Sequence, residues 1–360
     1  MKTSRIVILI AVVLVVVILI LFAYEATLSS GTSPWSPAAN YPLQVSGVFA
    51  VAGQQCFNST GYIYCIGGQD ADGGPRNEVY SASVLTTPSH NVTSWVSDPN
   101  PYPQNINGQS CVTYSGYVYC VGGSYDDGGD DVASSYYAPL RGNGVIGNWN
   151  LTTAYPIPID SQYCVASSAH IYCVGGNNET DGTNADSTAS NSVWYAPLSP
   201  SGIGAWSHST PYPANLYFPS CFSSAGYIYC LGGADNNNNA QSTDFYAVLL
   251  PTGVGTWAPT TAYPIQVSGQ ACAFSSGYIY CVGGQEGSNS YSNAVYYAAV
   301  SSGGIGVWKQ AGPYPLSVGT TCVISSGYMY CMGGFDGSSQ GDTEATYHIS
   351  LATLSGTASG

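Results

Sequence analysis

The chain has 360 residues, and its 19 acidic against 5 basic residues give a formal net charge of -14. This balance argues against a nucleic-acid partner, whose phosphates need Lys and Arg. Extensive disorder is also disfavoured, because 45% of the residues are hydrophobic and 13% are aromatic.

The N-terminus predicts a membrane anchor. No residue from Ile6 to Tyr24 is charged, a stretch long enough for a helix that spans a bilayer, and Lys2 and Arg5 precede it. The alternative is a cleaved signal peptide, although the apolar stretch is longer than in most such peptides and no clear A-x-A site follows. We expect a cytoplasmic stub, a transmembrane signal-anchor, a linker and an extracellular domain, at 1–5, 6–24, 25–32 and 33–360 respectively.

Twelve cysteines follow in six pairs with the same nine-residue spacing: Cys56 and Cys65, Cys111 and Cys120, Cys164 and Cys173, Cys221 and Cys230, Cys272 and Cys281, Cys322 and Cys331. A small residue and a glycine at the centre of most pairs, such as Ser276-Gly277, predict a two-residue hairpin turn. Counted from this turn, the two cysteines face each other within disulfide reach, so we expect one cross-strand disulfide per pair. The rival, a thiol metal or catalytic site, lacks C-x2-C spacing and accompanying histidines.

After each cysteine pair come Gly-Gly, a polar loop and a third β-rich segment such as "NAVYYAAVS". In five of the six copies a tryptophan and then Tyr-Pro follow, as in "WAPTTAYP". The repeating unit is therefore four short strands with a period of about 53 residues. The Tyr-Pro pairs are expected to anchor the crossings between units.

These features resemble the kelch repeat, in which a strand ends in Gly-Gly, an aromatic residue lies on the third strand and a tryptophan on the fourth. Gly283-Gly284, Tyr297 and Trp308 match that pattern in the fifth copy. The resemblance implies an all-β, six-bladed β-propeller. The sixth copy has no tryptophan, whereas Trp35 stands alone before the first copy, so the N-terminal strand around Trp35 should close the ring.

The acidic residues gather in one kind of segment. In a propeller, the loops between strands two and three share a face with the connections between blades, and every carboxylate of the domain, Asp98 and Asp160 included, falls in such a segment. We predict a binding face that looks away from the membrane, formed by Asp70, Asp72, Arg76, Asp126, Asp127, Asp130, Asp131, Glu179, Asp181, Glu286 and Asp336. The alternative is that these acids serve only turn formation. Asp70 with Asp72, or Asp126 with Asp130, are candidate Ca2+ ligands, although neither loop completes an EF-hand.

The sequence offers little for catalysis. Of the four histidines, His90 and His170 map to loops of the opposite face, His208 to an outer strand and His348 to a third strand. No two converge on the acidic face or the channel, which disfavours a catalytic triad or a histidine metal site. Among kelch propellers, the sialic-acid mutarotases are an architectural analogy, and Arg76 is the only arginine on the predicted face to meet the carboxylate of such a substrate. We expect no enzyme, and a mutarotase-type site would need a pocket in which Arg76 and a carboxylate converge.

The sequence thus predicts a membrane-anchored extracellular protein that binds or scaffolds an unknown protein or glycan, with no cofactor apart from candidate Ca2+. The alternatives are a carbohydrate-active enzyme of sialic-acid mutarotase type and a Ca2+-stabilised surface-layer component. Four Asn-x-Ser/Thr sites suit a glycoprotein: Asn58, Asn91, Asn150 and Asn178. Because few side chains titrate, stability is expected to change little from neutral pH down to about 2.

Overall fold

A computed structural model describes residues 33–42, 44–45, 48–49, 53–70, 74–84, 90–125, 130–178, 188–287, 290–335 and 343–356. The chain divides into two units, Met1–Pro34 and Trp35–Gly360, and the fold below is that of the second. The predicted stub, transmembrane helix and linker lie outside the described residues. No helix within the described ranges is both long and apolar enough to cross a membrane.

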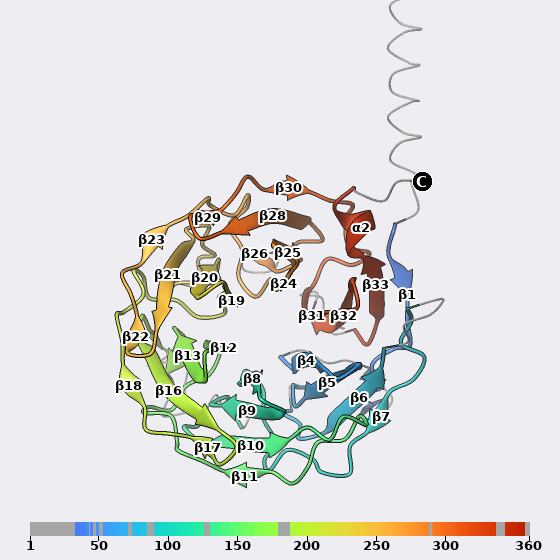
Figure 1. The fold of residues 1–360 in the computed structure, drawn as a ribbon. Coiled ribbons are helices and arrows are strands. Elements are labelled where there is room, and N and C mark those ends of the chain that lie inside the picture. The colour runs from blue at the N-terminus through green and yellow to red at the C-terminus, as the bar shows by residue number, and fades with distance from the viewer. Residues whose placement is uncertain are drawn as a thin grey trace, which may run out of the picture. The chain divides into compact units, whose positions relative to one another are not determined.

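Trp35–Gly360 is a ring of six antiparallel blades around a central channel, as predicted (Figure 1). The innermost strands are β4 (Gln55–Ser59), β8 (Ser110–Tyr114), β12 (Tyr163–Ser167), β19 (Ser220–Ser224), β24 (Ala271–Ser275) and β31 (Gly319–Ser325). The second strands are β5 (Tyr62–Ile66), β9 (Tyr117–Val121), β13 (His170–Val174), β20 (Tyr227–Leu231), β25 (Tyr278–Val282) and β32 (Tyr328–Phe335). The third strands are β6 (Val79–Ser83), β10 (Ser135–Pro139), β16 (Val193–Ser199), β21 (Phe245–Leu250), β28 (Val295–Ser301) and β33 (Thr346–Ser350).

The outer strands are short: β7 (Val96–Ser97), β11 (Asn150–Leu151), β18 (Ser207–His208), β23 (Ala258–Pro259), β30 (Lys309–Gln310) and β1 (Ser36–Pro37). Three third strands continue into small hairpins with β17 (Gly202–Ile203), β22 (Gly253–Val254) and β29 (Gly304–Ile305). Three further hairpins lie in the loops: β2 (Gln44–Val45) with β3 (Val48–Phe49), β14 (Asn177–Asn178) with β15 (Thr188–Ala189), and β26 (Gln285–Gly287) with β27 (Ser290–Tyr291).

The N-terminal strand closes the ring, as the lone Trp35 predicted. Strand β1 pairs with β33 of the last blade, with Ser36 opposite His348. The Trp35 ring packs edge-on against Tyr314 at 4.9 Å. The helix α2 (Leu351–Leu354) was not predicted; it follows β33, and the Ser355 carbonyl beyond it accepts a hydrogen bond from the Tyr297 hydroxyl at 3.1 Å.

The predicted hairpins and disulfides are confirmed in every blade. In the first, Cys56 lies opposite Cys65 and the turn residues Thr60 and Gly61 both have positive φ, the geometry of a type I′ turn. All six disulfides join Cα atoms 4.0 to 4.1 Å apart. Each disulfide therefore links the innermost strand of a blade to its second strand.

Contacts between blades explain the other repeated residues. A Cβ on Gly122 would lie 2.4 Å from the Ile159 carbonyl oxygen of the next blade, so the first glycine of the pair admits that backbone. The tyrosines of the Tyr-Pro pairs are buried, and Tyr102 packs edge-on against Trp149 at 4.9 Å. The Trp149 indole in turn donates to the Asn100 carbonyl. The predicted anchoring role of Tyr-Pro is confirmed.

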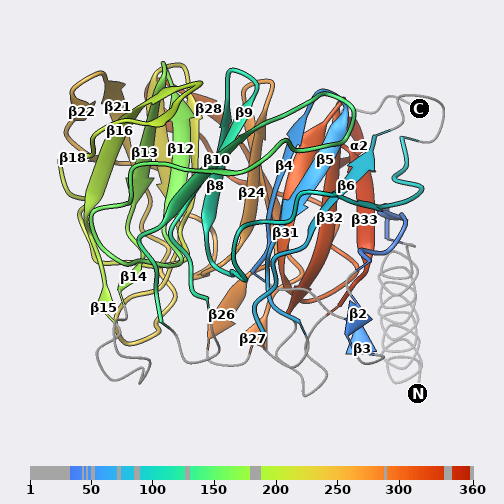
Figure 2. The same cartoon turned by 90° about the horizontal axis from the view of Figure 1, so that it is seen from below.

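The ring has two different faces. One carries the connections between blades and the loops between second and third strands, and we name it the loop face. Figure 2 shows its hairpins β2–β3, β14–β15 and β26–β27 at the lower edge. The opposite face carries the tight turns within the disulfide hairpins. The innermost strands begin at the loop face, and this start of the channel is where the candidate site lies.

Candidate functional site

A cavity of about 360 Å³ occupies the loop-face end of the channel, and we name it the mouth cavity. All six blades contribute to its wall through the starts of their innermost strands, and the loops and the end of β32 add four side chains and a glycine. The lining residues are 53–56, 107–109, 160–163, 218–220, 268–272 and 319–322, with Gln69, Gln285, Tyr291, Gly334 and Phe335. A second cavity of about 300 Å³ lies between the innermost strands and shares Gln55, Cys56, Tyr163 and Cys322 with the first.

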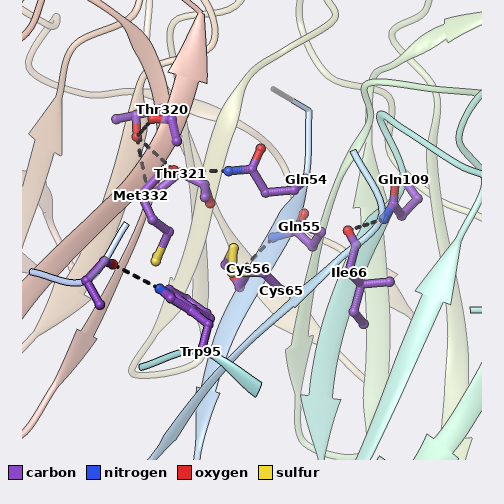
Figure 3. Close-up of a disulfide and its surroundings, with 12 residues drawn as sticks. Gln54, Gln55, Cys56, Cys65, Ile66, Trp95, Gln109, Thr320, Thr321 and Met332 are labelled. Atoms are coloured by element: carbon purple, nitrogen blue, oxygen red, sulfur yellow. Dashed lines mark hydrogen bonds between the residues drawn. A yellow bond between two sulfur atoms is a disulfide. The ribbon is translucent and has the colours of Figure 1, made fainter. Parts of the chain in front are cut away.

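Buried glutamines connect neighbouring blades at this wall. The Nε2 groups of Gln54, Gln109, Gln162 and Gln270 donate to carbonyls at the ends of the preceding blades' second strands, at 2.8 to 3.0 Å. Figure 3 shows two of these bonds, from Gln54 to Met332 and from Gln109 to Ile66. One N–H of each amide therefore links two neighbouring blades.

The side-chain oxygens of these amides differ from the nitrogens in their hydrogen bonding. Among the described residues, the buried Oε1 atoms of Gln109, Gln162 and Gln270 have no hydrogen-bond partner. An amide oxygen can only accept a hydrogen bond. Each Nε2 also has a second N–H beside the one that binds the neighbouring blade, so these amides carry donors as well as acceptors.

Backbone hydrogen bonds form a collar at the mouth. Ser161 N donates to Gly108 O, Phe218 N to Ser161 O and Gly269 N to Phe218 O, at 2.9 to 3.1 Å. The collar residues Gly53, Gly108, Ser161, Phe218 and Gly269 all have φ between 51° and 68°. Glycine adopts this conformation freely, whereas a bulky residue rarely does.

Phe218 is therefore the exceptional member of the collar. Its φ is 51°, it precedes Pro219, which narrows its backbone range further, and its side chain is 44% exposed. On another part of the wall, Phe335 packs edge-on against Tyr291 at 5.5 Å and is 36% exposed. The mouth cavity thus has aromatic surface at its rim.

Asp160 supplies the charge of the cavity. Its Oδ2 accepts a hydrogen bond from the Ser161 hydroxyl at 2.8 Å, and its backbone is paired with Asn177. Among the described lining residues it is the only Asp or Glu, and none is Lys, Arg or His. Asp160 also contributes to raising the pKa of Tyr217, whose main cause is burial.

The residues predicted for the acidic face are only partly gathered. Asp70 is buried, pairs with Arg76 and accepts a hydrogen bond from Gly74 N at 2.9 Å. Arg76 therefore does meet a carboxylate, but neither residue is among the described lining residues of the mouth cavity. Asp130 accepts from the Tyr125 hydroxyl, and Glu286 is exposed. Asp131 is half-buried, with its backbone bridged to Ser124. The other predicted acids lie outside the described residues: Asp72, Asp126, Asp127, Glu179, Asp181 and Asp336.

The expectation that every carboxylate lies on one open face is wrong for two residues besides Asp70. Asp98 is buried, and its Oδ2 accepts from Ile146 N of the next blade at 2.6 Å. Thr152 makes the same contact to Ile203 one blade on, so Asp98 replaces a hydroxyl that joins two blades. Asp244 is 1% exposed and accepts from Gly232 N at 3.0 Å; burial raises its pKa to about 7.

The histidines, the candidate metal ligands and two of the glycosylation sites can also be located in the structure. His90 stacks on Tyr328 and His348 lies on β33, and the described residues contain no group of three or more His, Cys, Asp or Glu that could hold a metal. A cation at Asp70 would have to displace the Arg76 guanidinium. Of the glycosylation sites, Asn150 is exposed on an outer strand, and Asn58 is exposed on β4, where it lines the second cavity.

The sequence interpretation missed the wall of the mouth cavity. A signal was present, because a glutamine stands two residues before the first cysteine in four blades, at Gln54, Gln109, Gln162 and Gln270. Phe218, which lines the cavity with Gln69 and Gln285, breaks the pattern set by glycine in other blades.

No protein-family model matches this chain, and no curated protein is similar to it in sequence. Among solved structures, that of YjhT is similar, with a TM-score of 0.66 at 12% identity, covering 86% of this chain and 96% of YjhT. Identity this low supports the shared propeller fold and nothing finer. Membership of the kelch family stays a prediction from the repeat.

Proposed function

We propose that the protein is a membrane-anchored extracellular binding module that takes its ligand at the loop face, with the mouth cavity as the central recess. The observation that carries this proposal is the cavity itself, about 360 Å³ in a wall built from all six blades. Such a volume lies within the range of small-molecule sites, which are usually concave and largely pre-formed. Six disulfides are typical of a protein exposed to an oxidising compartment.

The surrounding loops support a binding role for the same face. Exposed Glu286 and half-buried Asp130 and Asp131 lie in loops that join second and third strands. Their charge extends the negative potential of the cavity outward and would concentrate positively charged partners near the mouth.

A cavity-filling variant tests the proposal. Gln55 lines both cavities from the start of β4 and is half-buried, so Gln55→Trp should occupy the cavity while leaving the backbone unchanged. We expect compounds that raise the melting temperature of the natural protein to lose that effect in Gln55→Trp, whereas Gln55→Ala should keep it. Retention of every such effect in Gln55→Trp would move the site away from the mouth.

A carbohydrate-active enzyme of sialic-acid mutarotase type is the second candidate. The observation in its favour is that Asp160 places a carboxylate on the cavity wall, where it could transfer a proton. Against it, Arg76 is paired with Asp70 and is not among the described lining residues. Exchange between sialic-acid anomers, followed by NMR, should be no faster with the protein than with Asp160→Asn if the protein only binds.

A further inference from the structure

On the premise that the mouth cavity is the binding site, we infer that its ligand is a small organic cation with a protonated amine or a quaternary ammonium group. Two independent features of the wall lead to this class: its charge and its aromatic surface.

The charge of the wall favours a cation. Asp160 is the only Asp or Glu among the described lining residues, and no Lys, Arg or His accompanies it there. Exposed Glu286 next to the lining residue Gln285 adds negative charge at the rim, and the whole chain has a net charge of -14. In a recess with low-dielectric walls this field attracts cations and repels carboxylates and phosphates.

The aromatic surface favours an alkylated or extended cation. Phe218 is held with φ of 51° at a collar position where Gly53, Gly108 and Gly269 stand in other blades, and its side chain remains 44% exposed. The ring contacts Tyr217, with centroids 5.3 Å apart, and much of its surface remains open to solvent. Its backbone N–H binds the carbonyl of Ser161, the neighbour of Asp160, so the aromatic residue and the carboxylate belong to the same side of the mouth. An aromatic face beside a carboxylate is a recurrent arrangement for organic cations.

Choline and its uncharged isostere 3,3-dimethylbutan-1-ol provide a direct test. Calorimetric titrations would use the full chain in a neutral polyoxyethylene detergent, which has neither an ammonium nor a sugar head group. We expect choline to bind at least tenfold more tightly than the isostere, with an affinity that falls as salt is raised. Equal affinities for the two compounds would overturn the inference.

Two variants locate the binding. Asp160→Asn keeps the backbone pairing with Asn177 and should weaken choline binding about tenfold. Phe218→Gly restores the residue found in other blades, so it should weaken choline binding while raising the melting temperature, because the left-handed strain disappears. Unchanged choline affinity in both variants would contradict the inference.

Further probes separate this inference from the function on which it rests. If methyl glucoside or sialic acid binds in place of choline and Gln55→Trp abolishes that binding, the mouth cavity is a site and the cation inference is wrong. If choline, methyl glucoside and sialic acid all fail to bind at millimolar concentration, both the inference and the proposed site are contradicted.

Discussion

Asp244 shows how one buried residue gives the propeller a pH dependence. It is 1% exposed, and burial raises the pKa of its carboxyl from 3.8 to about 7. Between these two values the folded chain keeps a proton that the unfolded chain releases. The resulting stability is fully present below pH 3.8 and is lost as the pH rises through about 7.

We therefore expect the protein to be more stable at pH 5 than at pH 8, by a free energy of unfolding on the order of 2–3 kcal/mol at most. This differs from the flat profile expected from composition, because composition counts titrating groups without their burial. Thermal unfolding between pH 4 and 8 would show the slope, and Asp244→Asn should remove most of it. An identical slope in Asp244→Asn would assign the effect to other groups.

At the scale of the element, one of the six hairpin turns has a different residue at its second position. The third blade has Ser168-Ala169 with φ of 48° and 61°, whereas the other five turns have glycine at the second position. Alanine in the left-handed region costs about 1–2 kcal/mol, partly offset by the smaller entropy it loses on folding. This hairpin is therefore the least favourable of the six for local reasons.

Replacing Ala169 by glycine should raise the free energy of unfolding by about 0.5–1 kcal/mol. The reverse change, Gly226→Ala in the fourth blade, should lower it by a similar amount, and there a new Cβ would meet nothing within 4 Å. Denaturant unfolding of the two variants measures both effects. A loss of stability in Ala169→Gly would show that the turn conformation is not the controlling feature.

At the scale of the whole molecule, the ring could be predicted because its determinants repeat. Cysteine pairs, glycine pairs and the tryptophan with Tyr-Pro each act within one blade or between two neighbours, so each recurs with the period of the chain. The closure by Trp35 followed from the piece missing in the sixth copy.

The candidate site was harder to predict because its residues do not repeat with the period of the chain. Asp160, Phe218 and Phe335 come from different blades and meet at one cavity only when the ring is closed. Asp98 was also hard to place, because its partner Ile146 lies 48 positions along the chain. The residue predicted in a loop is therefore a buried contact between two blades. Single departures from a repeat, such as Phe218 in place of glycine, are the part of the sequence that periodicity does not explain.

The most direct test of the mouth cavity as a site for organic cations is a crystal structure with (2-bromoethyl)trimethylammonium, whose bromine scatters anomalously. The account predicts one strong bromine peak in the mouth cavity, with the trimethylammonium group within about 6 Å of the Phe218 ring. A cavity without a bromine peak at saturating ligand, with peaks only elsewhere on the ring, would contradict it.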